Sequence, residues 1–233
     1  MDLAFMADSF LRLLGGVPLT LRLAFSSVAL GLALALALVA LTRQPIAPLG
    51  WIAHAYVFVF RGTPLLVQVF LIYYGLGQFR PVLQDYGIWW LFREPYYCAL
   101  VALTLNTAAY TAEIVRGGLQ SVPAGAIEAA RAFGMSGVTL YWRIIAPLGV
   151  RQALPAYGSE VILMIKATSL ASTITLMEIT GVAHKLISES FRAIEVFLCA
   201  GSIYLMINFT MTATFLLIER WVAPDLRAAD RKS

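Results

Sequence analysis

Five long apolar segments limit what this chain can fold into. They cover approximately residues 19–41, 49–75, 96–115, 152–172 and 197–218. A helix needs about 20 apolar residues to cross the hydrocarbon core of a bilayer. Spanning backbone must also satisfy its own hydrogen bonds, which restricts it to helices and closed barrels. The pattern therefore predicts an all-α polytopic membrane protein with about five transmembrane helices.

Composition supports a membrane protein and argues against several other classes. The 233 residues are 60% hydrophobic and only 13% charged, which is too apolar for an average soluble domain. The net charge of +4 comes from scattered residues rather than a basic stripe, so a nucleic-acid partner is not expected. Cys98 and Cys199 lack metal or disulfide spacing, and His54 and His184 are isolated, so no metal site is predicted.

The N-terminal residues do not resemble a cleavable signal. Asp2 and Asp8 stand where such a signal would carry positive charge, and no small-residue cleavage site follows the first apolar run. We expect the first span to be retained. Residues up to about Gly16 are mildly amphipathic, and we expect their apolar side chains to lie on a headgroup surface. These side chains are Leu3, Phe10, Leu11 and Leu14.

The second apolar segment is longer than one straight crossing requires and contains Arg61-Gly62-Thr63-Pro64. It is either a span interrupted in mid-membrane or an interfacial helix followed by a span that starts at Thr63. Both interpretations make Thr63 a helix cap and Pro64 the first helical residue. The break can present helix amides, with Arg61 as a clamp, to a substrate carboxylate. Alternatively, Arg61 is an interfacial anchor. Residues 76–95, rich in Tyr and Trp, are expected to lie outside the membrane.

Residues 127–147 form the densest polar run between two apolar segments. The pattern predicts two short helices separated at Gly134, which is suited to a left-handed helix end. Gly125 is the expected cap of the first helix and Ser136 that of the second, which Pro147 is expected to stop.

This run resembles the EAA loop of the membrane subunits of bacterial ABC importers. The matching positions are Glu128-Ala129-Ala130, Gly134, Ile144 and Pro147, whereas Ala146 departs from the usual Leu. In that family the loop is the surface on which a separate ATPase docks. The alternative is an ordinary helical hairpin, with Glu128 stabilising a helix dipole. The resemblance implies an ATPase-coupling role for Glu128, Ala129, Ala130, Arg131, Gly134, Arg143 and Pro147.

Two more stretches, residues 60–68 and 102–113, are similar to the second and third spans of permeases for polar amino acids. The histidine, basic amino acid and opine importers belong to this branch. The resemblance covers nearly the whole chain. It implies one type I importer permease domain over 1–233 with a coupling loop at about 121–150. It also implies a homologous permease subunit, identical or merely similar, two ATPases that hold ATP–Mg, and an extracytoplasmic binding protein.

A polar stripe lies in the third apolar segment. Asn106, Tyr110 and Glu113 are spaced four and then three residues apart, so they share one helix face. Such a stripe must face protein or water, because an unpaired polar group in hydrocarbon costs several kcal/mol. It either lines a translocation path or packs between subunits, with Glu113 paired to Arg116.

Glu160 lies inside the fourth apolar segment, where an ionisable residue is a functional candidate. It suits the cationic group of a basic substrate, or it forms a structural ion pair with a neighbouring span. Lys166 is about 120° around the helix and is not its direct partner. The full set of substrate-path candidates is Arg61, Thr63, Gln68, Asn106, Tyr110, Glu113 and Glu160.

No Walker loop, nucleophile elbow or HExxH motif occurs. Without a Walker loop the chain cannot bind ATP in the P-loop manner, so the energy for transport must come from another polypeptide. The function that the resemblance implies is ATP-driven import of a polar, basic amino acid or opine, without catalysis or a bound cofactor in this chain. A permease for neutral or acidic amino acids is the alternative. An ATPase-independent carrier, or a membrane-embedded enzyme using Glu113 and Glu160, is more remote. The resemblance implies a bacterial inner-membrane protein, and the distribution of basic residues predicts that its N-terminus lies outside and its C-terminus in the cytoplasm.

Overall fold

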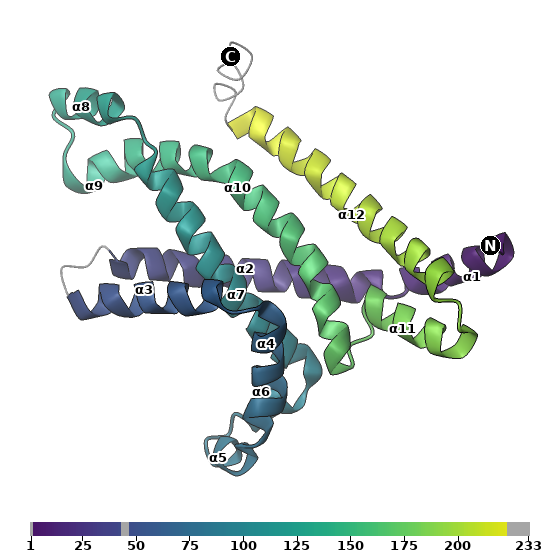
Figure 1. Cartoon of the computed structure of the whole chain (residues 1–233). Coiled ribbons are helices and arrows are strands. Elements are labelled where there is room, and N and C mark those ends of the chain that lie inside the picture. Colours follow the sequence, from purple (N-terminus) through teal and green to yellow (C-terminus); the bar gives the residue numbers. More distant parts are fainter. Residues whose placement is uncertain (1, 43–46, 223–233) are drawn as a thin grey trace.

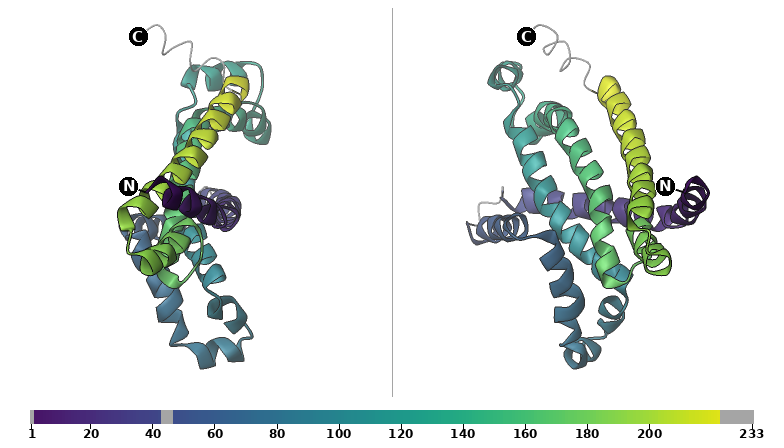
Figure 2. Two further views of the ribbon diagram at one scale, coloured as in Figure 1. Left: turned by 90° about the vertical axis from the view of Figure 1, so that its right-hand side faces the viewer. Right: turned by 45° about the vertical axis from the view of Figure 1, so that its right-hand side comes forward.

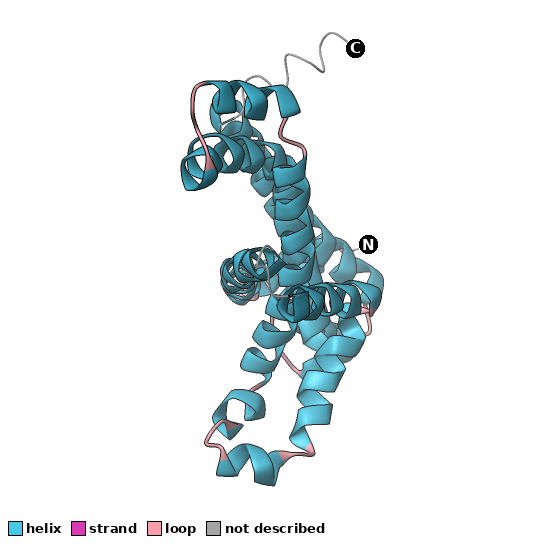
Figure 3. Ribbon diagram, turned by 90° about the vertical axis from the view of Figure 1, so that its left-hand side faces the viewer, coloured by secondary structure: helices cyan, strands magenta, loops and turns pink. Residues whose placement is uncertain are grey.

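The computed structural model describes residues 2–42 and 47–222, and every regular element in these ranges is helical (Figures 1 and 3). Three of the elements are not α-helices: η1 and η2 are π-helical and η3 is a 3-10 helix. The elements are α1 (Leu3–Leu14), α2 (Val17–Thr42), α3 (Ala47–Gly62), α4 (Leu65–Phe70), η1 (Leu71–Gly75), α5 (Arg80–Asp85), α6 (Trp89–Arg93), α7 (Pro95–Gln120), α8 (Ala124–Ala132), α9 (Gly137–Leu140), η2 (Tyr141–Ile145), α10 (Ala146–Ala167), η3 (Thr168–Ile174), α11 (Ile179–Ser190) and α12 (Ala193–Val222).

The predicted apolar segments correspond to three long helices and two bent pairs. Leu3–Thr42, Pro95–Gln120 and Ala193–Val222 are each long and apolar enough to cross a membrane. Pro48–Gly62 and Leu65–Gly75 meet at 105°, and Gly137–Ile174 meets Ile179–Ser190 at 47°. The described residues thus give three candidate spans, or up to five if each bent pair is one span.

The long helices pack around α7. Helix α2 crosses α7 in the most extensive contact of the fold, and α10 lies against α7 on one side and α12 on the other (Figures 1 and 2). Small residues permit these crossings. A Cβ on Gly118 of α7 would lie 2.5 Å from the carbonyl oxygen of Gly149 and 2.7 Å from the Cβ of Ala153, both on α10. The two backbones therefore touch, which only glycine allows.

The N-terminal helix packs more closely onto the protein than its sequence predicts. Leu13 of α1 is fully buried, and Phe10 packs against the cluster formed by α1, α11 and α12. Leu3 and Leu11 are largely exposed, as expected for a headgroup-facing side. The prediction for Phe10 was wrong because α11 and α12, distant in sequence, cover this face of α1.

The short helices lie in two groups, at opposite ends of the long helices (Figure 1). Helices α8 and α9 lie at the same end of the molecule as the last turns of α12 (Figure 1). Helix α11 lies at the other end of α10 and α12, and α5 also lies far from α8. The segment 76–95 contains α5 and α6 and connects η1 to α7.

Two predicted helix boundaries were wrong. Pro123 precedes the first residue of α8, so Gly125 lies inside the helix rather than capping it. Pro147 does not stop a helix, because it occupies the first turn of α10, where no backbone N–H is needed. The preceding turn is π-helical over Tyr141–Ile145, and this wider turn lets the chain continue through the proline.

Candidate functional site

Helices α3 and α4 form an elbow at residues 62–64, where the chain turns by 105°. Pro64, not Thr63, occupies the capping position, and α4 begins at Leu65. The Thr63 hydroxyl donates instead to the carbonyl oxygen of Val59, 2.8 Å away in α3. The predicted break is confirmed, but the predicted cap and first helical residue were each one position too early, because the Thr63 side chain bonds backward.

Two amide side chains stabilise the elbow. The Gln68 Nε2 group donates to the carbonyl oxygens of Phe60 at 2.9 Å and Thr63 at 3.1 Å, and to the Thr63 hydroxyl at 2.8 Å. Asn106 of α7 donates to Gln68 Oε1 at 3.1 Å and to the Phe60 carbonyl oxygen at 3.4 Å. Both amides are buried. They satisfy carbonyl groups that the end of α3 leaves without helical partners.

Charged groups lie beside this amide pair. Arg61 Nη1 is 3.5 Å from Glu113 Oε2, and its guanidinium lies 5.3 Å from the centre of the Tyr110 ring. Arg116, one turn further along α7, also binds Glu113, with Nε donating to Oε1 at 3.0 Å. The side chains of Arg61 and Arg116 are 44% and 40% exposed, so solvent or a ligand can reach them. Two guanidiniums share one carboxylate, which leaves a net positive charge.

The structure therefore brings six of the seven substrate-path candidates into one site, which we call the elbow cluster. Its predicted members come from both sides of the elbow and from the polar stripe of α7, and Arg116 completes it. The predicted pairing of Glu113 with Arg116 is present, together with the additional contact to Arg61. The cluster consists of Arg61, Thr63, Gln68, Asn106, Tyr110, Glu113 and Arg116.

Glu160 is separate from the elbow cluster. Its Oε1 accepts a hydrogen bond of 2.8 Å from Thr107, which follows Asn106 on α7 but belongs to a different face of that helix. The Glu160 side chain is buried, and Lys166 is exposed. Within the described part of the chain no salt bridge involves Glu160. A structural ion pair was one of two predicted roles, and the hydrogen bond from Thr107 takes its place.

The loop at residues 121–150 has the predicted break. Gly134 has φ of +80°, in the left-handed region, and its N–H bonds to the Arg131 carbonyl at the end of α8. Ser136 precedes α9 in an extended conformation but makes no side-chain capping bond there. Ala130 is buried, whereas the other residues with an expected ATPase-coupling role are exposed. The exposed ones are Glu128, Ala129, Arg131, Gly134, Arg143 and Pro147.

This loop also exposes large apolar side chains that the sequence analysis did not single out. Phe133 is 85% exposed and Trp142 is 67% exposed. The described part of the chain leaves both rings largely uncovered. The sequence could have indicated their exposure, because Phe133 and Trp142 both lie inside the predicted loop, one on either side of Gly134.

Glu178 is a buried carboxylate that the sequence analysis missed. It caps α11 by accepting a hydrogen bond from the Gly181 N–H at 2.8 Å, and Tyr204 of α12 donates to its other oxygen at 2.6 Å. The Thr20 hydroxyl accepts from the Ile179 N–H in the same place. Residues 173–192 are less apolar than the five apolar segments, so apolar length gives no helix prediction for them. A carboxylate three residues before Gly181 is the capping signal that could have located the start of α11.

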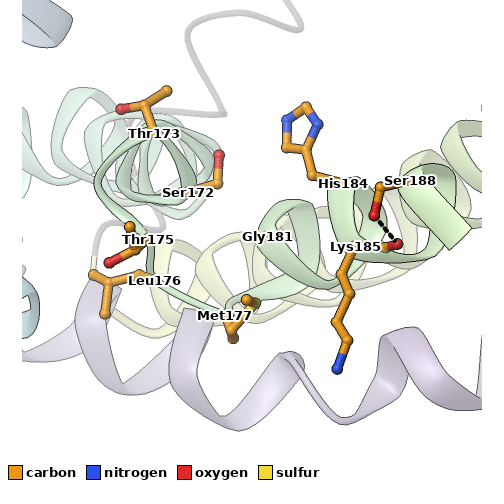
Figure 4. A pocket seen from close by; sticks show the side chains of 9 residues that line it. All are labelled: Ser172, Thr173, Thr175, Leu176, Met177, Gly181, His184, Lys185 and Ser188. Carbon is orange, nitrogen blue, oxygen red and sulfur yellow. Dashed lines mark hydrogen bonds between the residues drawn. The ribbon is translucent and has the colours of Figure 1, made fainter.

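A cavity of about 430 Å³ lies where η3 meets α11 (Figure 4). Ser172 and Thr173 line it from η3, and Gly181, His184 and Ser188 line it from α11. The Ser188 hydroxyl donates to the Lys185 carbonyl oxygen, so it serves the helix backbone. Helix α11, which lines the cavity, lies at the end of α10 opposite α8 and α9 (Figure 1).

Comparisons with known proteins agree with this architecture. Residues 27–224 match the family model for the binding-protein-dependent transport system inner membrane component. The octopine transport system permease protein OccM of Rhizobium radiobacter is 58% identical over 229 residues, covering 97% of this chain and 92% of that protein. The nopaline transport system permease protein NocM of Agrobacterium fabrum is 53% identical, covering 98% and 95%. The arginine ABC transporter permease protein ArtM of Escherichia coli is 46% identical, covering 73% and 76%.

A solved structure shares the fold. It is the crystal structure of an amino acid ABC transporter with histidines, 32% identical, with a TM-score of 0.84 over 94% of this chain and 98% of that one. The predicted all-helical permease fold and the resemblance to importers of the polar amino acid branch are confirmed. The chain therefore belongs to the family of binding-protein-dependent transport system inner membrane components, as the permease component of an ABC transporter.

Proposed function

We propose that this chain carries a basic amino acid or an arginine-derived opine across the inner membrane, with the elbow cluster in its translocation path. The relatives named for octopine, nopaline and arginine transport support this substrate class. The observation that carries the assignment is the contact between Arg61 and Glu113 beside a helix break, where both side chains are partly exposed. Ionisable groups within spanning segments are costly unless they serve a path or a partner.

The elbow cluster suits a ligand with charges of both signs. A substrate carboxylate can replace Glu113 on Arg61 and accept two parallel hydrogen bonds from the guanidinium. Glu113, which Arg116 still holds, is then available to the ammonium or guanidinium group of the substrate. In this exchange Arg61 keeps a carboxylate partner and Glu113 keeps cationic partners. Neutral or acidic amino acids remain the second candidate, because a carboxylate is common to all of them.

Glu160 has a more indirect place in the proposed path. It is buried between α7 and α10 and already accepts a hydrogen bond from Thr107, so substrate reaches it only when these helices separate. In that open state its carboxylate is suited to the cationic group of the substrate.

Coupling in this proposal runs through the loop at 121–150, within a single permease domain over 1–233. The exposed Glu128, Arg131 and Arg143, together with Phe133 and Trp142, offer a mixed polar and apolar docking surface to an ATPase. Two such ATPases hold ATP–Mg. A homologous permease, either a second copy or a similar chain, completes the membrane core, and an extracytoplasmic binding protein delivers the substrate. Membrane lipid surrounds the core, and no nucleic acid takes part.

The proposed orientation puts the 121–150 loop and the C-terminal end of α12 in the cytoplasm, and the N-terminus outside. These two segments lie at the same end of the molecule (Figure 1), which supports their sharing one side of the membrane. Most arginine and lysine residues outside the spans then face the cytoplasm, as the positive-inside rule requires.

Reconstitution tests this function. The complete importer in proteoliposomes is expected to accumulate radiolabelled arginine or octopine only with ATP, the ATPases and the binding protein present. Uptake that persists without the ATPases would identify a self-sufficient carrier. The variants Arg61→Ala and Glu113→Ala are expected to reduce uptake at least tenfold while leaving assembly intact. Unchanged uptake in both variants would contradict the proposal that the elbow cluster lies in the translocation path.

A further inference from the structure

The buried amides of the elbow have no hydrogen-bond donors left for a substrate. Gln68 Nε2 shares its hydrogens among the Phe60 carbonyl, the Thr63 carbonyl and the Thr63 hydroxyl. Asn106 Nδ2 donates to Gln68 Oε1 and the Phe60 carbonyl. The relative exposures of Gln68 and Asn106 are 6% and 7%. A ligand could bind either donor only by leaving buried carbonyl groups unpaired, which is unfavourable.

These bonds do fix the position of Arg61. Phe60, whose carbonyl oxygen accepts from both amides, is the residue immediately before Arg61. The opposite anchor is Asn106, which lies on the same face of α7 as Tyr110 and Glu113. The end of α3 is thereby tied to the helix that carries the partners of Arg61, and the Arg61 guanidinium lies over Tyr110 and beside Glu113.

We propose that Gln68 and Asn106 are positioning residues, which hold Arg61 over the polar stripe of α7 so that it can bind the substrate carboxylate. This inference rests on the proposed function, in which Arg61 lies in the path. It changes the predicted role of the two amides, because they act through Arg61 rather than by touching the substrate. Preorganised guanidinium geometry matters because a bidentate contact requires a fixed approach angle.

Binding measurements can separate positioning from a purely structural role. The permease–ATPase complex in nanodiscs, without binding protein, is titrated with arginine and with agmatine, which lacks the carboxylate. The near-isosteric variants Gln68→Met and Asn106→Leu are expected to weaken arginine binding about tenfold and leave agmatine binding unchanged, because only the carboxylate contact is lost. Asn208→Leu, an amide replacement on α12 outside the elbow, is the control and is expected to leave the binding of both ligands unchanged.

Combination with Arg61→Ala provides the decisive comparison. If the amides act through Arg61, adding Gln68→Met to Arg61→Ala causes no further loss of arginine binding. Equal weakening of arginine and agmatine by Gln68→Met, or additive losses in the double variant, would overturn the inference. Thr63→Val removes one of the three acceptors of the Gln68 amide, together with the hydroxyl's own bond to Val59, and is expected to cause a smaller shift in the same direction. It serves as the test if the amide variants do not assemble.

The result for Arg61→Ala alone keeps the two proposals distinct. If that variant still prefers arginine to agmatine, the assignment of Arg61 to the path fails. If Arg61→Ala loses the preference while Gln68→Met and Asn106→Leu retain it, the path assignment stands and the positioning role fails.

Discussion

The Thr107 hydroxyl donates a 2.8 Å hydrogen bond to the buried carboxyl group of Glu160, which connects α7 to α10. Thr107 also lies where α2 crosses, since a Cβ on Gly31 of that helix would press directly on its Cγ2 methyl group. Three helices therefore meet at one threonine. The adjacent Asn106 belongs to the elbow cluster, so neighbouring residues of α7 serve two separate polar groups.

Removing the Thr107 hydroxyl is expected to destabilise the permease. Thr107→Val keeps the shape of the side chain but leaves a buried carboxyl oxygen without its donor, at a cost of about 1–3 kcal/mol. The midpoint of thermal unfolding of the assembled complex should fall. Adding Glu160→Leu should restore part of the loss, because the unpaired group is then absent. A double variant less stable than Thr107→Val would contradict this account of Glu160.

The crossing of α7 and α10 predicts opposite behaviour for two adjacent glycines. Gly118→Ala would press a methyl group against the backbone of Gly149, so we expect a loss of about 1–3 kcal/mol from overpacking. A methyl group on Gly117 would meet no neighbouring atom within 4 Å, so Gly117→Ala should be neutral or stabilising by up to about 1 kcal/mol. Thermal unfolding of both variants checks this. Equal effects would mean that the two helices do not touch at Gly118.

Gly134 provides a test of the coupling loop. Its φ of +80° costs an L-residue about 1–2 kcal/mol, so Gly134→Ala should distort the turn between α8 and α9. The expected result is a lower ratio of transported substrate to hydrolysed ATP in the reconstituted importer, with spans intact. Gly125→Ala is the matched control, because Gly125 lies within α8 with open space around it. If the two variants couple equally well, the turn geometry is unimportant for docking.

Sequence alone predicted the features of this fold that depend on local chemistry. Apolar length predicted the candidate spans, since it reflects the thickness of the bilayer, and Gly134 was recognisable because few other residues adopt its backbone conformation. The 3.6-residue period placed Asn106 and Glu113 on one face. The period does not say which helix covers that face. Hence neither the contact with Arg61 nor the isolation of Glu160 could be predicted without the packing of α3, α4 and α10.

Helix boundaries near Pro147 and Glu178 were missed for a different reason. Proline stops a helix in most contexts, but a π-helical turn before it allows the helix to continue, and neither apolar periodicity nor capping residues reveal that turn. Glu178 was passed over because the segment around it is less apolar than a span. Its role depends on Tyr204, which is remote in sequence and becomes its neighbour only when α12 packs on α11.

The contact between Glu178 and Tyr204 yields the last prediction. Tyr204→Phe removes the donor to one oxygen of a fully buried carboxyl group, and the Gly181 N–H and the capping geometry remain. The expected cost is about 1–3 kcal/mol, concentrated at the junction of η3 and α11. Hydrogen exchange should therefore accelerate in the first turn of α11 and not in α7. Thr180→Val, which removes a hydroxyl 3.1 Å from the Tyr204 oxygen without touching the carboxylate, should have a smaller effect. Uniform acceleration across α7, α10 and α12 would instead mean that Glu178 stabilises the whole bundle, because α11 would then not open independently.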